Sequence, residues 1–72
     1  MLSDYGIKIK TYRKRANLNE AELANLVGVD TKTLVMYESG KKRPPMEIMG
    51  KLSHILDIDT DVLFGFQPKK KW

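Results

Sequence analysis

The most constraining feature of this 72-residue chain is a pair of short helix patterns separated by a break of three residues. The first pattern covers residues 20–27 and the second covers residues 31–39. Residues favoured at helix ends flank both patterns: Asn19 and Asp30 as N-caps, and Gly28 and Gly40 for the left-handed turn after a helix. Two such short helices joined by a tight corner pack steeply against each other, so the second projects outward, as in a helix-turn-helix that reads DNA. The pattern therefore predicts a DNA-binding module.

Charge is distributed unevenly along the chain, whose net charge is +4 at pH 7. Residues 1–45 include both helix patterns and carry nine basic and five acidic side chains. Residues 46–65 carry one basic and four acidic side chains, and three lysines follow near the C-terminus. This asymmetry favours a polyanionic partner for the first part of the chain. A solvated surface whose charges fell this way by chance is the alternative.

Length and composition limit the other possibilities. The chain is long enough for one small domain, which we expect over residues 1–65, followed by a basic tail over residues 66–72. It has no cysteine, so it can form neither a disulfide nor a thiolate metal site. No apolar run approaches the roughly 20 residues that span a bilayer, and the N-terminus lacks a secretory pattern. We therefore expect a soluble cytoplasmic protein with no membrane partner.

Apolar residues at helical spacing predict an all-α fold of five helices. The expected helices cover about residues 4–16, 20–27, 31–39 and 46–56, with a short fifth helix after Asp59. The expected inward-facing residues are Tyr5, Ile9, Tyr12 and Ala16, then Leu23, Ala24 and Val27, then Leu34 and Tyr37, and finally Met49, Leu52 and Leu56. Asn17 can take the left-handed position after the first helix, and Glu22 has the spacing for a capping box with Asn19.

These patterns resemble the lambda-repressor-like family of helix-turn-helix domains, the Cro/C1 type of the XRE family, over about residues 5–64. Two groups of residues carry the resemblance: Ala21-Glu22-Leu23-Ala24 followed by Val27-Gly28-Val29, and Tyr37-Glu38-Ser39-Gly40. The resemblance implies a compact five-helix bundle in which the second and third helices form the helix-turn-helix. It also implies a sequence-specific transcriptional regulator, with repression as the favoured role, that inserts the third helix into the major groove of double-stranded DNA.

The resemblance assigns DNA contacts to individual positions. The base-facing positions are Thr31, Lys32, Thr33 and Met36, and the phosphate-facing positions are Lys10, Lys14, Lys41, Lys42 and Arg43. Lysine can donate to guanine O6 or N7, and methionine can contact a thymine methyl group, whereas phosphate contacts position a protein without reading sequence. The resemblance also implies a structural salt bridge between Arg13 and Glu38.

Several residues depart from the family pattern. Glu20 stands where many relatives have a glutamine that contacts phosphate, and Asp30 adds a second carboxylate at the start of the third helix. Either carboxylate would repel a phosphate at these helix ends. Val35 and Met36 are apolar where many relatives are polar. These departures motivate an alternative function, a protein-interaction or antitoxin-like adaptor module that keeps the fold with weakened DNA binding.

A single module of this size buries a limited surface on DNA, so we expect a homodimer on two half-sites about one helical turn apart. The candidate residues for the dimer surface are Ile58, Phe64, Phe66 and Trp72. Packing of the aromatic residues onto their own bundle is the alternative.

An enzyme is poorly supported by the sequence. His54 is the single histidine, and no second histidine, cysteine or nucleophile motif accompanies it. The same shortage argues against a metal site. We expect no cofactor and no small-molecule substrate.

Overall fold

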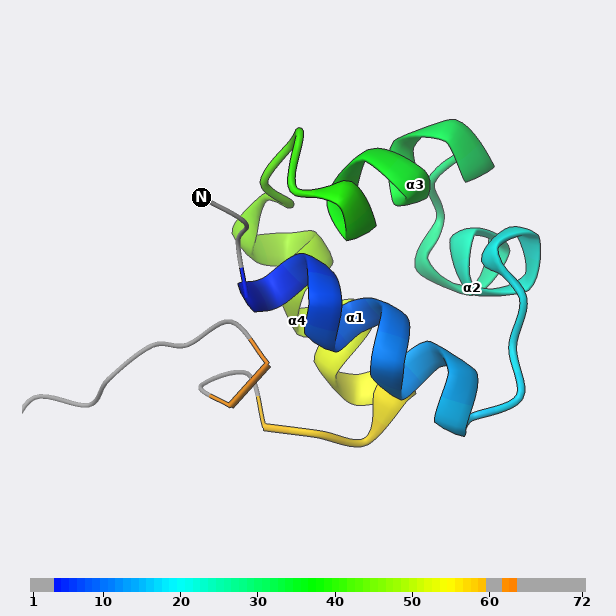
Figure 1. The fold of residues 1–72 in the computed structure, drawn as a ribbon, viewed down its shortest axis with the longest axis vertical. Helices are drawn as coiled ribbons and strands as arrows, with labels where there is room; N and C mark the ends of the chain where they lie inside the picture. The colour runs from blue at the N-terminus through cyan, green and yellow to red at the C-terminus, as the bar shows by residue number, and fades with distance from the viewer. Residues whose placement is uncertain (1–3, 60–61, 64–72) are drawn as a thin grey trace, which may run out of the picture.

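The described part of the chain, residues 4–59 and 62–63 of a computed structural model, is built from four helices (Figure 1). They are α1 (Asp4–Arg15), α2 (Glu20–Val27), α3 (Thr31–Ser39) and α4 (Met46–Leu56). No strand occurs among these residues, and the predicted all-α class is confirmed. None of the helices in the described ranges is long and apolar enough to cross a membrane.

The prediction of five helices is wrong for the described residues, which contain four. Most of the predicted fifth helix lies outside the described residues. Val62 and Leu63 are described, both have helical backbone, and the amide of Leu63 donates to the carbonyl oxygen of Asp59 at 2.9 Å.

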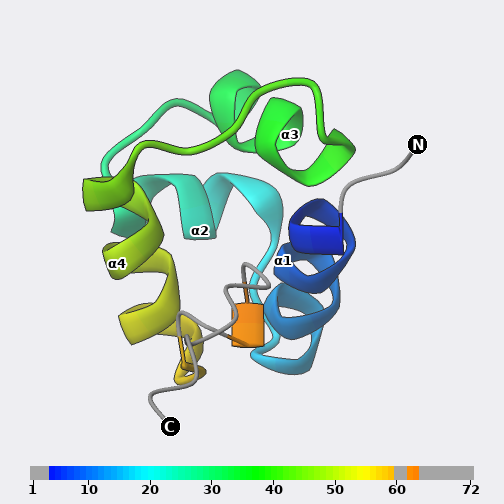
Figure 2. The ribbon, with the colours of Figure 1, turned by 90° about the vertical axis from the view of Figure 1, so that its left-hand side faces the viewer.

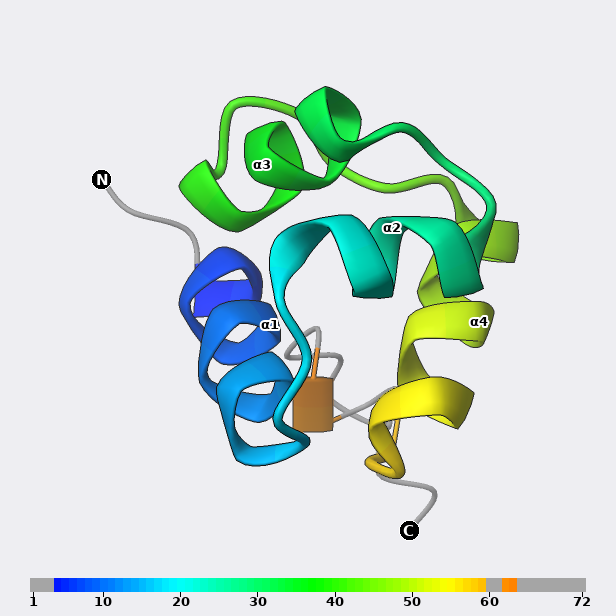
Figure 3. The ribbon, with the colours of Figure 1, turned by 90° about the vertical axis from the view of Figure 1, so that its right-hand side faces the viewer.

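The third helix lies across one end of the bundle, as Figures 2 and 3 show from opposite sides. α2 lies beneath α3 and between α1 and α4, while α1 and α4 run away from α3. α3 packs against α1 and α2, and α4 packs against α1 and α2. Val62 and Leu63 lie between α1 and α4 toward the other end. This arrangement leaves the side of α3 that faces away from the bundle open to a partner.

Apolar side chains from all four helices form one core with Leu63. Its buried members are Tyr5, Ile9, Leu23, Ala24, Val27, Leu34, Tyr37, Met49, Leu52, Leu56 and Leu63. The predicted inward residues of α2, α3 and α4 are confirmed. In α1 the prediction is wrong for Ala16, which is exposed, and Tyr12 is only partly buried. The reason is that α1 ends at Arg15 and the chain turns away at Asn17, which has a φ of 60°.

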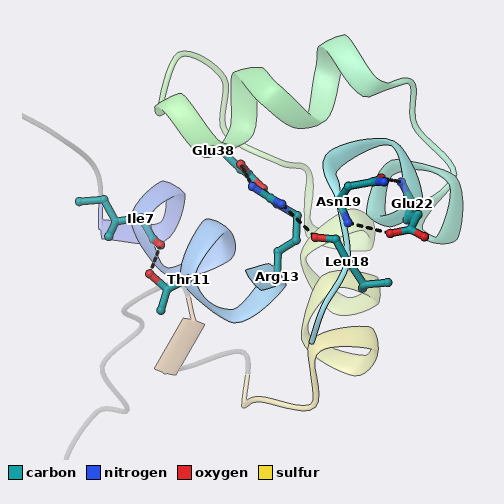
Figure 4. A network of polar contacts seen from close by, with 7 residues as sticks. All are labelled: Ile7, Thr11, Arg13, Leu18, Asn19, Glu22 and Glu38. Atoms are coloured by element: carbon teal, nitrogen blue, oxygen red, sulfur yellow. Dashed lines mark hydrogen bonds and ion pairs between the residues drawn. The ribbon is translucent and has the colours of Figure 1, made fainter. Parts of the chain in front are cut away.

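Local hydrogen bonds fix the ends of the two helices of the helix-turn-helix. The side-chain oxygen of Asn19 accepts from the amide of Glu22 at 2.7 Å, and the carboxylate of Glu22 accepts from the amide of Asn19 at 2.8 Å (Figure 4). This is the predicted capping box, which satisfies two amides at the start of α2. Gly28 and Gly40 have φ values of 90° and 80°, the left-handed conformation predicted for both.

A glycine brings α1 and α3 into close contact. A Cβ atom on Gly6 would overlap the carbonyl oxygen of Glu38 and would lie 3.0 Å from the carbonyl oxygen of Tyr37. Gly6 therefore lets the first turn of α1 pack directly on the backbone at the end of α3. No local pattern in the sequence predicts this role of Gly6, although a glycine inside a helix costs about 1 kcal/mol relative to alanine and therefore indicates a packing requirement.

Candidate nucleic-acid interface

One side of α3 is open to solvent. Leu34 and Tyr37 point into the core, and helical spacing places Lys32 and Met36 on the opposite side, one turn apart. The four predicted base-facing residues all retain exposure: Thr31 and Lys32 are exposed, and Thr33 and Met36 are partly exposed. Val35 is 39% exposed on the same side. The outer surface of α3 is therefore a mixed one, with a lysine, hydroxyl groups and two apolar side chains.

A basic loop runs beside α3. This basic loop, residues 40–45, connects α3 to α4 along the outer end of the molecule (Figures 2 and 3). It carries the predicted phosphate-facing residues Lys41, Lys42 and Arg43, all of which are exposed. The hydroxyl of Tyr5 donates to the carbonyl oxygen of Lys42 at 3.1 Å. The structure thus brings three of the five phosphate candidates together next to the base-facing candidates.

The other two phosphate candidates lie elsewhere. Lys10 and Lys14 are exposed on α1, which begins next to α3 and then runs away from it (Figure 2). No described contact joins either side chain to the basic loop. They form a separate part of the charged surface.

A carboxylate lies among the basic groups at the start of α3. Asp30 occupies the N-cap position, but its carboxylate accepts from the hydroxyl of Thr33 at 2.8 Å and makes no capping bond to a backbone amide. Asp30 therefore takes the predicted N-cap position of α3, and its side chain bonds to Thr33 in place of a backbone amide. The Thr33 hydroxyl lowers the pKa of Asp30 below its ordinary value, with its own backbone amide and the charges of Lys32 and Lys42 contributing. Asp30 is thus ionised at neutral pH within the field of both lysines.

A nearly buried ion pair holds the end of α3. Arg13 Nε lies 2.7 Å from Glu38 Oε2, and Arg13 Nη2 lies 3.3 Å from Glu38 Oε1 (Figure 4). Arg13 Nη1 also donates to the carbonyl oxygen of Leu18 at 2.9 Å. The two charged side chains are only 8% and 5% exposed. Arg13 therefore joins α1, the segment before α2 and the end of α3.

Electrostatics keep the guanidinium of Arg13 charged. The hydrogen bond to Glu38 raises the pKa of the Arg13 guanidinium above its ordinary value against the opposing effect of burial, and the charges of Glu38 and Glu20 add to the increase. Arg13 is thus charged throughout the neutral range. The negative charge of Glu20 therefore interacts with the positive charge of Arg13 in the same chain.

Among the described residues, no group of three or more histidine, aspartate or glutamate side chains could hold a metal ion. His54 is exposed on α4, where it lines a shallow groove with Asp57 and Asp59.

The hydrogen bond from the Tyr5 hydroxyl to the basic loop could not be predicted from the sequence, because the position of the Lys42 carbonyl depends on the tertiary fold. The sequence offered only a tyrosine on a predicted apolar face.

Comparison with known proteins identifies the family. The chain matches the sequence profile of a helix-turn-helix family over residues 9–63. An uncharacterised HTH-type transcriptional regulator of Archaeoglobus fulgidus is 31% identical over 65 residues, which cover 90% of this chain and 92% of the relative.

Two solved structures share the fold and include DNA. The c2 repressor of P22, crystallised with a synthetic operator, matches with a TM-score of 0.82 and 27% identity, over 88% of this chain and 96% of the repressor. SinR, a master regulator for biofilm formation, crystallised with DNA, matches with a TM-score of 0.75 and 32% identity, over 82% of this chain and 95% of that chain. With its helix-turn-helix, its four-helix core and these relatives, the chain belongs to the Cro/C1-type helix-turn-helix family of transcriptional regulators.

Proposed function

We propose that this protein is a sequence-specific repressor that binds double-stranded DNA by inserting α3 into the major groove. The observation that carries the proposal is the exposed side of α3, with Lys32 and Met36 opposite the core, beside the basic loop. An α-helix fits the major groove, whose width is about 12 Å. The P22 repressor and SinR are each crystallised with DNA, which supports the same use of the shared fold here.

The residues of α3 would divide the work of reading bases. Lys32 donates to guanine O6 or N7, and Met36 packs against a thymine methyl group. Thr31 can bond to a base edge or to a phosphate. The hydroxyl hydrogen of Thr33 is taken by Asp30, so this oxygen is suited to accept a hydrogen bond, as from the amino group of adenine or cytosine.

Phosphate contacts would come from the basic loop and from α1. Lys41, Lys42 and Arg43 would meet the backbone next to the groove, and Lys10 and Lys14 would add charge beside it. Glu20 and Asp30 would oppose these contacts. The Arg13–Glu38 ion pair would hold α3 at a fixed angle while the surface around it binds.

The functional unit would be a homodimer, because a single domain of this size covers only part of an operator. Among the candidate residues for the dimer surface, Ile58 is partly buried against its own core, and Phe64, Phe66 and Trp72 lie outside the described residues.

The experiment that tests the function is selection of bound duplexes from a random pool, followed by titration of the selected duplex and a scrambled one at several salt concentrations.

The expected result is an enriched motif and an affinity that falls steeply as salt rises, since bound phosphates release counterions. The selected duplex should bind at least about 1,000-fold more tightly than the scrambled one. No binding to either duplex at low salt would contradict the proposal.

That negative result would favour a protein-interaction or antitoxin-like module. Two observations support this second candidate. Asp30 places a negative charge on the outer end of the molecule. Leu26 is 54% exposed and lines an apolar groove with Ile55 between α2 and α4.

A further inference from the structure

We infer that Tyr5 is a positioning residue for DNA binding, which holds the basic loop at the distance from α3 that phosphate contact needs. The inference rests on the proposed function, because the loop matters only if it meets the DNA backbone. Tyr5 itself is 7% exposed and would not touch the DNA. It would act through the residues that it contacts.

Tyr5 contacts two successive residues of the basic loop. Its hydroxyl donates to the carbonyl oxygen of Lys42 at 3.1 Å. The guanidinium carbon of Arg43 lies 5.4 Å from the centroid of the Tyr5 ring, within range of a cation–π interaction. One buried side chain of α1 thereby fixes both the backbone at Lys42 and the side chain of Arg43.

The loop is held at both ends as well. The amides of Lys41 and Lys42 donate to the carbonyl oxygen of Met36 at 3.0 and 3.3 Å, and Pro44 is fully buried. Between these points the charged side chains stay exposed. Lys42 lies near enough to Asp30 for its charge to lower the pKa of that carboxyl. The loop is thus kept along α3, and Tyr5 attaches it to a third element, α1.

The first turn of α1, which carries Tyr5, is packed closely against the end of α3. Gly6 packs on the backbone at Glu38, so the first turn of α1 and the end of α3 cannot slide apart without losing that contact. Removal of the Tyr5 hydroxyl should therefore free the loop while leaving α3 in place. A loop that must be ordered at the moment of binding weakens the complex, because ordering an interface costs free energy.

Tyr5→Phe is the informative variant, since it removes the hydroxyl and keeps the ring. Tyr12→Phe is the matched control: Tyr12 lies on the same helix, its ring faces Arg15 at 5.2 Å, and its hydroxyl makes no hydrogen bond to the described residues. The experiment measures amide hydrogen exchange at Lys41 and Lys42 in the free protein. It then measures the affinity of each full-length variant for the selected and scrambled duplexes across a salt series, with thermal unfolding as a check on the fold.

In Tyr5→Phe the two loop amides should exchange about five times faster, the scale expected for loss of one neutral hydrogen bond. Affinity for both duplexes should fall by a similar factor of about three to ten, so that the preference between them is unchanged. The slope of log affinity against log salt should shrink by about 1, as expected when one phosphate contact is lost. Tyr12→Phe should match the wild type in all three measurements.

Exchange, affinity and salt slope all unchanged in Tyr5→Phe would overturn the inference. So would equal changes in the Tyr12→Phe control, or an affinity loss explained by the fraction unfolded with an intact salt slope. Failure of the wild-type protein to bind either duplex would contradict the proposed function instead. The exchange rates would then still decide whether the Tyr5 hydroxyl holds the loop.

Discussion

Lys32 and Lys42 carry the same charge, but Lys32 lies on a helix and Lys42 lies on a loop. Lys32 projects from α3 on the side opposite the core, whereas Lys42 belongs to a loop whose backbone is bonded to Met36 and Tyr5. A side chain on a helix inside the groove reaches base edges, and a side chain on a flanking loop reaches phosphates. The same substitution should therefore have different consequences at the two positions.

Lys32→Ala should reduce the preference for the selected duplex, with a loss of about 1–3 kcal/mol of discrimination at one base pair. Lys42→Ala should weaken selected and scrambled duplexes alike and reduce the salt slope by about 1. Competition titrations at several salt concentrations measure both quantities. If the two variants changed both duplexes in the same way, the division between base reading and backbone positioning would be wrong.

Asp30 places a negative charge at the start of α3, where it would oppose the proposed binding of DNA. Since its pKa is lowered in the folded protein, the carboxylate keeps its charge throughout the neutral pH range. Asp30→Asn removes that charge and retains an oxygen that can accept from Thr33. Affinity for DNA should rise about three- to tenfold at low salt, and the gain should diminish as salt screens the repulsion. Asp59→Asn, beyond the far end of α4, is the control, and an equal gain there would refute a local effect of Asp30.

At the scale of helices, the agreement between sequence and structure follows the range of the interactions. The bounds of α2 and α3 are predictable because the Asn19–Glu22 capping box and the left-handed glycines are signals within a few residues. Contacts that set the angle of α3 join residues far apart in the chain. The Gly6 contact and the Tyr5 hydrogen bond join residues far apart in the chain and leave no periodic pattern, so neither can be predicted from the sequence. The Arg13–Glu38 pair came from the family resemblance, not from spacing.

The two glycines within helices offer a matched test of helix packing. Gly6→Ala adds a Cβ that would overlap the Glu38 carbonyl oxygen, so α1 must move, and we expect a loss of about 1–3 kcal/mol in the free energy of unfolding. Gly50→Ala adds a Cβ with no atom within 4 Å and should gain about 0.5–1 kcal/mol from lower unfolded-state entropy. Denaturant titration measures both changes. Stabilisation by Gly6→Ala similar to that by Gly50→Ala would show that α1 and α3 are not closely packed.

The ion pair at the end of α3 should contribute more than an exposed pair. Glu38→Ala leaves the nearly buried guanidinium of Arg13 without its carboxylate, and we expect a loss of about 3 kcal/mol in the free energy of unfolding. Glu47→Ala removes an exposed carboxylate from α4 and should change stability by less than about 0.5 kcal/mol. A difference of less than about 1 kcal/mol between the two variants in denaturant titrations would contradict the structural role of the pair.

Across the whole molecule, the helix proposed to read DNA and the segment after α4 lie toward opposite ends. α3 and the basic loop occupy one end, and Val62 and Leu63 lie toward the other, between α1 and α4 (Figure 3). A homodimer formed through the far end would leave both copies of α3 free to reach DNA. The sequence does not determine the dimer surface, because an apolar side chain near the C-terminus can pack on its own bundle or on a second copy. Three of the four candidates follow Leu63.

A homodimer on two half-sites makes DNA binding depend on their spacing. Insertion of 5 base pairs between the half-sites should abolish most of the affinity gained from the second site, because it rotates one half-site by about half a turn. Insertion of about 10 base pairs returns both half-sites to the same face of the DNA and should recover part of that affinity. Titration of the three duplexes, together with sedimentation of the free protein, measures this. Equal affinity at every spacing would indicate that single copies bind independently.

The most direct test of the account is to map the DNA contact on the protein by nuclear magnetic resonance, with the labelled chain titrated by its selected duplex. We predict that the largest amide shift changes lie in residues 31–36 and 41–43, on the exposed side of α3 and in the basic loop. Changes concentrated at Leu26 and Ile55, in the groove between α2 and α4, with α3 unaffected would contradict the claim that α3 reads DNA.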